Sequence, residues 1–282
     1  MKTTTALLMS VLLLTGGKKD IFSTKSIESR MVKVETNLYT NKYETSNAEY
    51  RAFLTWIKQN KVDKLEAYEV KHEGWDGFYK AEYRKSYATS SYFDNYPVVN
   101  ITHESALAFC DWMTDQYNNS TDRKKKFKEV KFRLPTKQEW LSMAINGRPH
   151  HMKYPWGGPY MRNRDGKYLA NFRKFGNHAI KMDINDPEKV EINGIEDLSG
   201  EGTILEGGVT ISAPVNSYIA TGAGLHNLAG NAAEMLAEKG HTKGGSWGSS
   251  GYYLQIDAED EFEGFNYSPY VGFRYVMEVI EE

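Results

Sequence analysis

Short periodic stretches of apolar residues, separated by irregular segments, characterise the first part of this chain. Residues 31–35 alternate apolar and polar positions, which predicts a half-buried strand. Residues 47–57 place apolar side chains at helical spacing, with Asn47 as the predicted N-cap. A short apolar run at residues 97–101 predicts another strand. The region between these elements is irregular and rich in aromatic and charged residues.

Two further helices are predicted before residue 146. Thr102 is a suitable cap for an amphipathic helix that continues over residues 106–117. Thr136 and Glu139 have the spacing of a capping box at the start of a helix over residues 137–145. These signals are local, because each depends only on neighbours within one or two helical turns.

Helical periodicity fades from Gly147 onward. Residues 147–225 are rich in Gly, Asn, Pro and Asp, which predicts long loops held in place by aromatic side chains or bound ions. Strand-like pieces then resume at residues 243–247, 252–256 and 272–279. No internal repeat or low-complexity linker follows residue 30, so we predict one loop-rich α+β domain over residues 31–282.

The composition is that of a soluble globular protein, with 40% hydrophobic and 26% charged residues. A net charge of −2 excludes a global basic field for nucleic acid, and the basic run 123–126 is interpreted as a solvated loop. The 24 glycines and 19 tyrosines are typical of a loop-rich fold. The single cysteine, Cys110, excludes an intrachain disulfide and is predicted to be a small buried side chain in a helix.

The N-terminus has the pattern of an export signal. An apolar run at residues 6–14 follows Lys2 and is too short to span a bilayer, which predicts a signal peptide over residues 1–17. The end of this segment resembles a bacterial lipobox in which Gly17 stands where the lipidated cysteine would be. Two interpretations stay open: Gly17 replaces a native cysteine, which we favour, or the natural protein is released without a lipid. We therefore expect a periplasmic or outer-membrane protein, lipid-anchored in its native form, with residues 18–30 as a tether.

A series of short motifs follows in a fixed order along residues 31–278. The motifs are residues 42–50, 96–102, 106–112, 133–140, 154–157, 170–171, 213–215, 224–231, 243–247 and 272–274. Together they resemble the formylglycine-generating-enzyme-like, or sulfatase-modifying-factor, family, and their common order is more specific than any one of them. The resemblance implies a C-type-lectin-like α+β fold with little regular secondary structure.

The resemblance implies two calcium sites. Calcium prefers six to eight hard oxygen ligands, which carbonyl and carboxylate loops provide. The first site would use the side chains of Asn227 and Glu234 and the carbonyls of Gly230 and Ala232. The second would use the Asn171 side chain and the Phe172 carbonyl, with a partner near residue 206. The alternatives are a glycine turn leading to a short helix, and an asparagine that caps a loop.

The resemblance also identifies where the chemistry of the family's oxidases would lie. Those enzymes hold copper(I) with two cysteines that follow the Gly-Gly-Ser-Trp or Gly-Gly-Ser-Tyr motif. The matching positions here are Ser249 and Leu254, and neither supplies the soft thiolate that copper(I) requires. Cys110 is far away in the sequence and cannot replace a pair. We therefore expect no bound copper, no catalytic residues and no formylglycine-generating activity.

The resemblance implies that residues 248–271, between the last two motifs, line the family's substrate groove. Here this segment is acidic and rich in tyrosine, which predicts a changed ligand such as a basic peptide, a glycan or a partner protein. A solvated acidic loop is the alternative. The predicted ligand or partner surface consists of Trp247, Ser249, Tyr252, Tyr253, Asp257, Asp260, Tyr267 and Tyr270.

These features favour a non-catalytic envelope protein that binds envelope protein partners. The lipobox-like start, the helix over residues 47–57 and the missing cysteines resemble lipoproteins of gliding motility and type IX secretion. The fold alone does not determine function, so two alternatives remain. One is a metal-dependent oxidase with an altered site, and the other is a lectin-like receptor that displays a ligand-binding surface.

Overall fold

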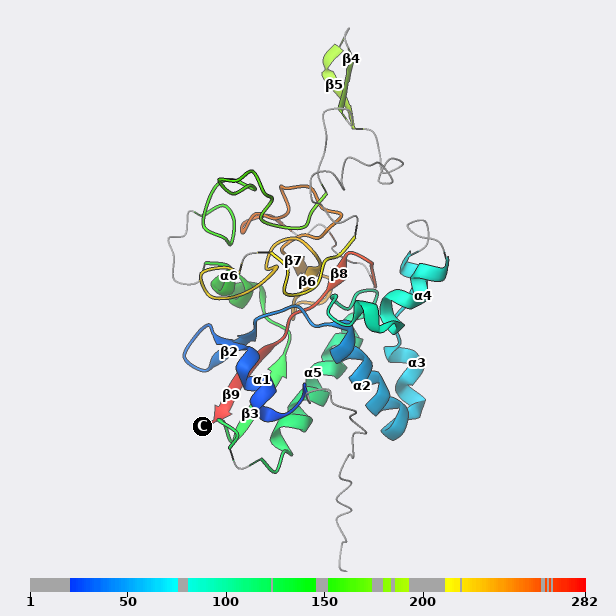
Figure 1. The fold of residues 1–282 in the computed structure, drawn as a ribbon, viewed down its shortest axis with the longest axis vertical. Helices are drawn as coiled ribbons and strands as arrows, with labels where there is room; N and C mark the ends of the chain where they lie inside the picture. The colour runs from blue at the N-terminus through cyan, green and yellow to red at the C-terminus, as the bar shows by residue number, and fades with distance from the viewer. Residues whose placement is uncertain are drawn as a thin grey trace, which may run out of the picture.

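The computed structural model describes residues 21–75, 81–122, 124–145, 152–173, 180–183, 186–192, 211–218, 220–259, 262, 264 and 266–282. Within these ranges, only the backbone is described for residues 81–84, 180–183 and 186–192. Figure 1 shows α1, α5 and the outer ends of β3 and β9 at one end of the molecule. The strands β6, β7 and β8 lie further along the long axis, among loops.

Helices and strands are both present, as predicted for an α+β fold. The helices are α1 (Thr24–Arg30), α2 (Asn47–Asn60), α3 (Leu65–Tyr68), α4 (Ala81–Thr89), α5 (His103–Asn118) and α6 (Lys137–Ile145), with 3-10 turns η1 (Val62–Lys64), η2 (His72–Trp75) and η3 (Ser91–Phe93). The strands are β1 (Met31–Lys33), β2 (Leu38–Asn41), β3 (Glu129–Arg133), β4 (Ile180–Asp183), β5 (Asp186–Ile192), β6 (Ala233–Met235), β7 (Thr242–Lys243), β8 (Val271–Gly272) and β9 (Val276–Glu281).

Two sheets organise the domain. The larger sheet has the order β1-β2-β9-β3, is antiparallel throughout, and brings the C-terminal strand between two strands from the first half of the chain. The smaller sheet has the order β7-β6-β8 and places β6 parallel to β8, with Glu234 opposite Gly272. The strands β4 and β5 pair only with each other. The smaller sheet positions the loops that carry the candidate site.

The helix starts follow the predicted capping chemistry. Thr102 caps α5, where its Oγ1 accepts a hydrogen bond from the Ser105 N–H at 3.2 Å. Thr136 and Glu139 form the predicted reciprocal pair at the start of α6. In α2 the cap is Ser46 rather than Asn47, because Ser46 has Glu49 three residues later and the two complete a capping box.

Three sequence predictions of local structure were wrong. The predicted tether is helical from Thr24, and Ile27 is fully buried in the core, so the folded domain begins before residue 31. Residues 97–101 form only an isolated bridge between Ser46 and Pro97, since proline lacks the N–H that a strand ladder needs. Residues 252–256 form successive turns, in which the Tyr253 and Gln255 N–H groups bond carbonyls three residues back.

The largest core cluster packs α2 and α5 against the antiparallel sheet. Its aromatic rings include Tyr50, Phe53 and Phe109, whose ring centroids lie 5.4–6.0 Å apart. Trp112 is buried in this cluster, and Trp140 is buried in a second one. Cys110 is buried in the largest cluster, as predicted, and burial raises the pKa of its thiol. Among the described residues, no helix combines the length and the apolar character that crossing a membrane requires.

Candidate functional site

A buried carboxylate joins three distant parts of the chain. Glu44 follows β2 and is fully buried. Its oxygens accept hydrogen bonds from Asn227 Nδ2 at 3.0 Å, Asn231 Nδ2 at 2.8 Å and the Ala232 N–H at 3.0 Å. Burial raises the pKa of Glu44 to about 8, while these donors and the Arg274 charge act in the opposite direction. Glu44 therefore fixes the loop of residues 227–232 to the start of α2.

The backbone of this loop requires its particular residues. Asn227 and Asn231 have φ angles of 50° and 67°, in the left-handed region that asparagine tolerates better than most residues. Gly230 has a φ of 79°, and a Cβ there would lie 2.3 Å from the Asn171 carbonyl oxygen. The loop consequently packs directly against the segment that carries the second predicted calcium ligand.

Glu234 forms a buried ion pair with Arg274. Both side chains are fully buried, and the Arg274 Nη2 lies 2.6 Å from Glu234 Oε1. Arg274 also donates to the backbone carbonyls of Asn41 and His226, and it thereby ties two further segments to Glu234. The Trp140 indole donates to Glu234 Oε2 at 2.9 Å. Burial raises the pKa of Glu234, and Arg274 acts against that shift.

The side chains predicted to bind calcium contain acceptor atoms that lack protein donors. The Oδ1 atoms of Asn227 and Asn171 are both buried without a hydrogen-bond partner. Buried acceptors normally find a donor, so two such atoms at predicted ligand positions fit a bound cation. Glu234 Oε1 accepts two bonds from Arg274, whereas Oε2 accepts one and keeps a lone pair. Asn227 Oδ1 and Glu234 Oε2 are therefore the side-chain acceptors of the first predicted site that have room for another bond.

The remaining predicted calcium ligands lie beside these atoms. The candidate ligand groups here are the backbone carbonyls of Gly230, Ala232 and Phe172. The Gly230 N–H bonds the Gly244 carbonyl, and Ala232 and Phe172 are buried. The partner expected near residue 206 lies outside the described residues. Within the described part of the chain, no three His, Cys, Asp or Glu side chains converge in a way that could hold a metal ion. Any cation here would thus depend mainly on amide and carbonyl oxygens.

The two positions that match the family's cysteines are both fully buried. Ser249 Oγ accepts a hydrogen bond from the Ser246 N–H at 2.8 Å and lies 3.1 Å from Ser246 Oγ. Leu254 packs in an apolar cluster with Tyr154, Ala170 and Phe172. The first position thus completes a polar turn and the second fills a core, so neither presents a ligand atom to solvent.

The predicted partner surface is partly exposed and partly buried. Tyr252 and Tyr267 are 57% and 37% exposed, and Asp257 is also exposed. Tyr253 and Tyr270 are half-buried, and Asp260 lies outside the described residues.

Trp247 and Ser249 were wrongly predicted to lie on this surface. Both are buried. Trp247 donates from Nε1 to the Pro269 carbonyl and packs between Trp75 and Tyr270, with ring centroids at 6.3 Å and 4.6 Å. The rings of Trp75, Trp247 and Tyr270 therefore pack together in the interior and join the loops that carry them.

A second loop contributes aromatic side chains that the sequence analysis missed. Tyr160 is 75% exposed, and its carbonyl accepts the hydrogen bond of the Trp156 indole. The loop of these residues lies against Gly251, where an added Cβ would meet the Met161 sulfur at 2.4 Å. Exposed rings therefore flank the contact between residues 156–161 and 251–253. The exposure of these rings could not be predicted, because residues 147–225 show no periodicity that separates buried from exposed positions.

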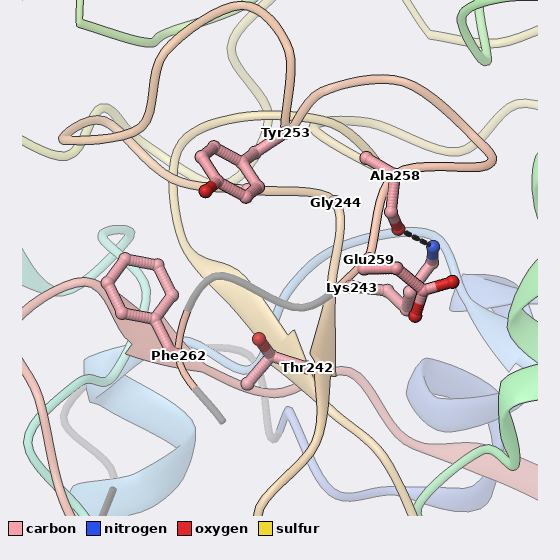
Figure 2. Close-up of a pocket in the computed structure, with 8 residues that line it drawn as sticks. Thr242, Lys243, Gly244, Tyr253, Ala258, Glu259 and Phe262 are labelled. Carbon is pink, nitrogen blue, oxygen red and sulfur yellow. Dashed lines mark hydrogen bonds between the residues drawn. The ribbon is translucent and has the colours of Figure 1, made fainter. Parts of the chain in front are cut away.

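Two cavities of different size are present, and the smaller one lies beside these loops. Figure 2 shows a small cavity where Tyr253 and Phe262 lie near β7 and the Lys243 ammonium points to the Ala258 carbonyl. Its volume is about 10 Å³, which is enough for one water molecule and no larger ligand. A larger hollow of about 190 Å³ lies elsewhere, between α2, residues 69–72 and the end of α4. The cavity beside β7 is thus too small to be a ligand pocket.

The whole chain matches one known domain family. The model of the sulfatase-modifying factor enzyme 1-like domain matches residues 2–279. The chain belongs to this family. A formylglycine-generating enzyme of Thermomonospora curvata is 29% identical over 147 residues, which cover 51% of this chain and 34% of that enzyme. The chain therefore aligns with about a third of the length of this curated relative.

Solved structures of the same fold family confirm the predicted fold class. CarF aligns with a TM-score of 0.51 and 17% identity, and the match covers 86% of each chain. PvdO from Pseudomonas aeruginosa aligns with a TM-score of 0.51 and 13% identity, over 86% of this chain and 80% of that one. At such identities the likeness shows the fold alone, which is the C-type-lectin-like fold of formylglycine-generating enzymes. The family includes enzymes.

Proposed function

We propose that this domain is a non-catalytic recognition module of the cell envelope. The observation that carries the proposal is the pair of buried residues, Ser249 and Leu254, at the positions of the family's catalytic cysteines. Copper(I) chemistry needs soft sulfur ligands, and a hydrogen-bonded serine with a core leucine supplies none. The one cysteine of the chain, Cys110, is buried in the core cluster and its raised pKa disfavours the thiolate.

The exposed aromatic face is the proposed recognition surface. Tyr160, Tyr252 and Tyr267 are the exposed large side chains on its loops, and Asp257 and Glu259 add negative charge. Tyrosine gives large contact area with few rotatable bonds, and it is common at protein-binding surfaces. We propose an envelope protein with a basic contact surface as the partner. The resemblance to gliding-motility and type IX secretion lipoproteins favours an assembly role in those systems.

The non-catalytic part of the proposal predicts a negative turnover assay. Purified protein with copper(I), dioxygen and a cysteine-bearing sulfatase peptide should produce no aldehyde, because no thiolate pair can hold the metal. A hydrazine probe for formylglycine with mass spectrometry measures this, and an active formylglycine-generating enzyme is the positive control. Aldehyde formation above the no-enzyme background would refute the proposal.

The recognition part predicts position-dependent crosslinking in cells. A photo-crosslinking phenylalanine analogue at Tyr160, Tyr252 or Tyr267 should give a discrete adduct, since these side chains lie on the proposed contact face. The control position is Val62, which is 68% exposed in η1, between α2 and α3. Figure 1 shows these two helices away from β6, β7 and β8. The proposal fails if adducts form equally from Val62, or if none of the three loop positions gives one.

We also propose that calcium stabilises the loop of residues 227–234. A cation that binds only the native state at 100 times its Kd adds about 2.7 kcal/mol, so a chelator should lower the Tm by about 5–10 °C in a domain of this size. Differential scanning calorimetry with and without chelator measures the shift. Asn227→Ala should abolish most of the chelator effect because it removes the orphaned Oδ1. A Tm that chelation leaves unchanged in the wild-type protein contradicts a structural calcium.

A further inference from the structure

A basic loop lies at the end of the molecule where the described chain begins. The loop follows α5 and contains Lys124, Lys125 and Lys126, of which the first and last are exposed. Figure 1 places α1 and the α5–β3 connection at the same end, while the loops of the candidate site lie toward the other end. The recognition face and the basic loop are therefore available to different partners.

The start of the chain and the basic loop are bound to each other directly. Thr24 Oγ1 donates to Asp122 Oδ2 at 2.6 Å, and the Lys126 N–H donates to Glu28 Oε1 at 2.6 Å. The Tyr117 hydroxyl donates to the same Glu28 oxygen at 2.6 Å. These bonds fix α1 on the loop, so whatever holds the N-terminus also sets the position of the lysines.

Three acidic side chains near this loop are engaged internally. Glu28 and Asp122 accept the bonds just described, and Asp122 also accepts from the Lys124 N–H. Glu281 pairs with Lys128 at 2.9 Å. Among the ion pairs of the described residues, none involves the three lysines of residues 124–126. Their charge is therefore available to an external anion.

The lysine side chains are already partly ordered. The Lys126 ammonium lies 4.8 Å from the centroid of the Phe127 ring and 5.2 Å from that of Tyr39. The Lys125 ammonium donates to the Asn118 carbonyl at 3.1 Å. Side chains held in this way lose less conformational entropy when they bind a charged surface.

We propose that this loop docks on anionic phospholipid headgroups next to the N-terminal membrane attachment. Ile21 lies four positions after position 17, where the lipobox-like segment ends. A fully extended chain of that length spans about 14 Å, so a lipid at position 17 would hold α1 and its bound loop close to the bilayer. One acyl anchor binds a membrane weakly, and a polybasic patch is an effective second attachment. The inference concerns membrane contact and does not depend on the recognition function.

Vesicle binding of the protein tests this proposal without a lipid anchor. The chain from Gly17 onward, which contains every described residue, is sedimented with phosphatidylglycerol or phosphatidylcholine vesicles at low ionic strength. It should bind phosphatidylglycerol vesicles only and dissociate as salt is added, because salt screens surface charge. Equal binding to the two lipids, or no binding to phosphatidylglycerol, would overturn the proposal.

Charge-reversal variants identify the surface. The triple variant Lys124→Glu, Lys125→Glu, Lys126→Glu should bind phosphatidylglycerol vesicles about 100-fold more weakly, since each basic residue at an anionic surface contributes about a five-fold factor. The matched control reverses three exposed basic residues at the other end, Lys153, Arg164 and Lys167, and should bind like the wild type. Equal losses in the two variants would show that only net charge matters and would contradict a defined docking loop.

A single substitution guards against misfolding of the triple variant. The Lys124 side chain is exposed, and only its backbone N–H makes a recorded hydrogen bond. Lys124→Glu should therefore keep the wild-type Tm in circular dichroism and still reduce binding about five-fold. Unchanged vesicle binding of this folded variant would count against the proposal.

Discussion

Arg274→Met is expected to lower the free energy of unfolding by about 3–5 kcal/mol, because it leaves the buried Glu234 carboxylate without its cation. The same change removes the donors to the Asn41 and His226 carbonyls, which join β2 and the loop before residue 227 to the segment between β8 and β9. Urea denaturation followed by near-ultraviolet circular dichroism measures the loss. The measurement is made with chelator present, so that calcium cannot compensate the charge of Glu234.

A double variant separates the ion pair from the other bonds of Arg274. Glu234→Gln with Arg274→Met removes both charges and keeps an acceptor for the Trp140 indole. Without an uncompensated buried charge, the double variant should be more stable than Arg274→Met alone. If the double variant is instead less stable than Arg274→Met, Arg274 acts mainly through its carbonyl contacts and the ion-pair argument is wrong.

The helices could be predicted from the sequence because their signals are local. Thr102 caps α5, and Thr136 with Glu139 starts α6, and each signal lies within four residues of the group that it satisfies. The helix α1 was missed because its seven residues carry a single fully apolar anchor, Ile27, whose burial depends on distant parts of the core. Periodicity cannot reveal such an anchor in so short a segment.

Most strands could not be predicted, because their partners are far away in the sequence. The strand β3 pairs with β9 about 150 residues later, and β6 pairs in parallel with β8 over two register positions. The strands β6, β7 and β8, of two or three residues, carry too few positions to show a clear alternation. The pairing of the strands in the large sheet is a consequence of long-range packing, which local patterns cannot predict.

The candidate site could be predicted only in part, because several of its contacts also join residues far apart in the sequence. The motif of residues 227–234 identified Asn227 and Glu234, and both prove to be buried with polar surroundings. The sequence could not show that Arg274 neutralises Glu234 from the segment between β8 and β9, or that Glu44 accepts bonds from the loop. Trp247 was placed on the surface because the family resemblance puts this part of the chain at the substrate groove, whereas Trp75 and Tyr270 cover it in the fold.

Glu44→Ala is expected to produce the second large loss of stability. The substitution orphans one donor each on Asn227, Asn231 and Ala232, all in a buried loop. Each buried donor without a partner costs about 1–3 kcal/mol, which for three donors gives a total on the order of 3–9 kcal/mol. Urea denaturation measures the loss, and Glu66→Ala on the exposed side of α3 is the matched control, with an expected change within about 0.5 kcal/mol.

The Glu44→Ala variant also tests whether Glu44 positions the proposed calcium ligand. Glu44 holds Asn227, whose free Oδ1 is the proposed calcium ligand, so Glu44→Ala should also abolish the Tm difference that chelator produces. Glu66→Ala should keep that difference in full. If Glu44→Ala is destabilised yet keeps the wild-type chelator effect, the loop would hold its conformation without Glu44. The bonds from Glu44 would then contribute to stability but would not position the cation ligand.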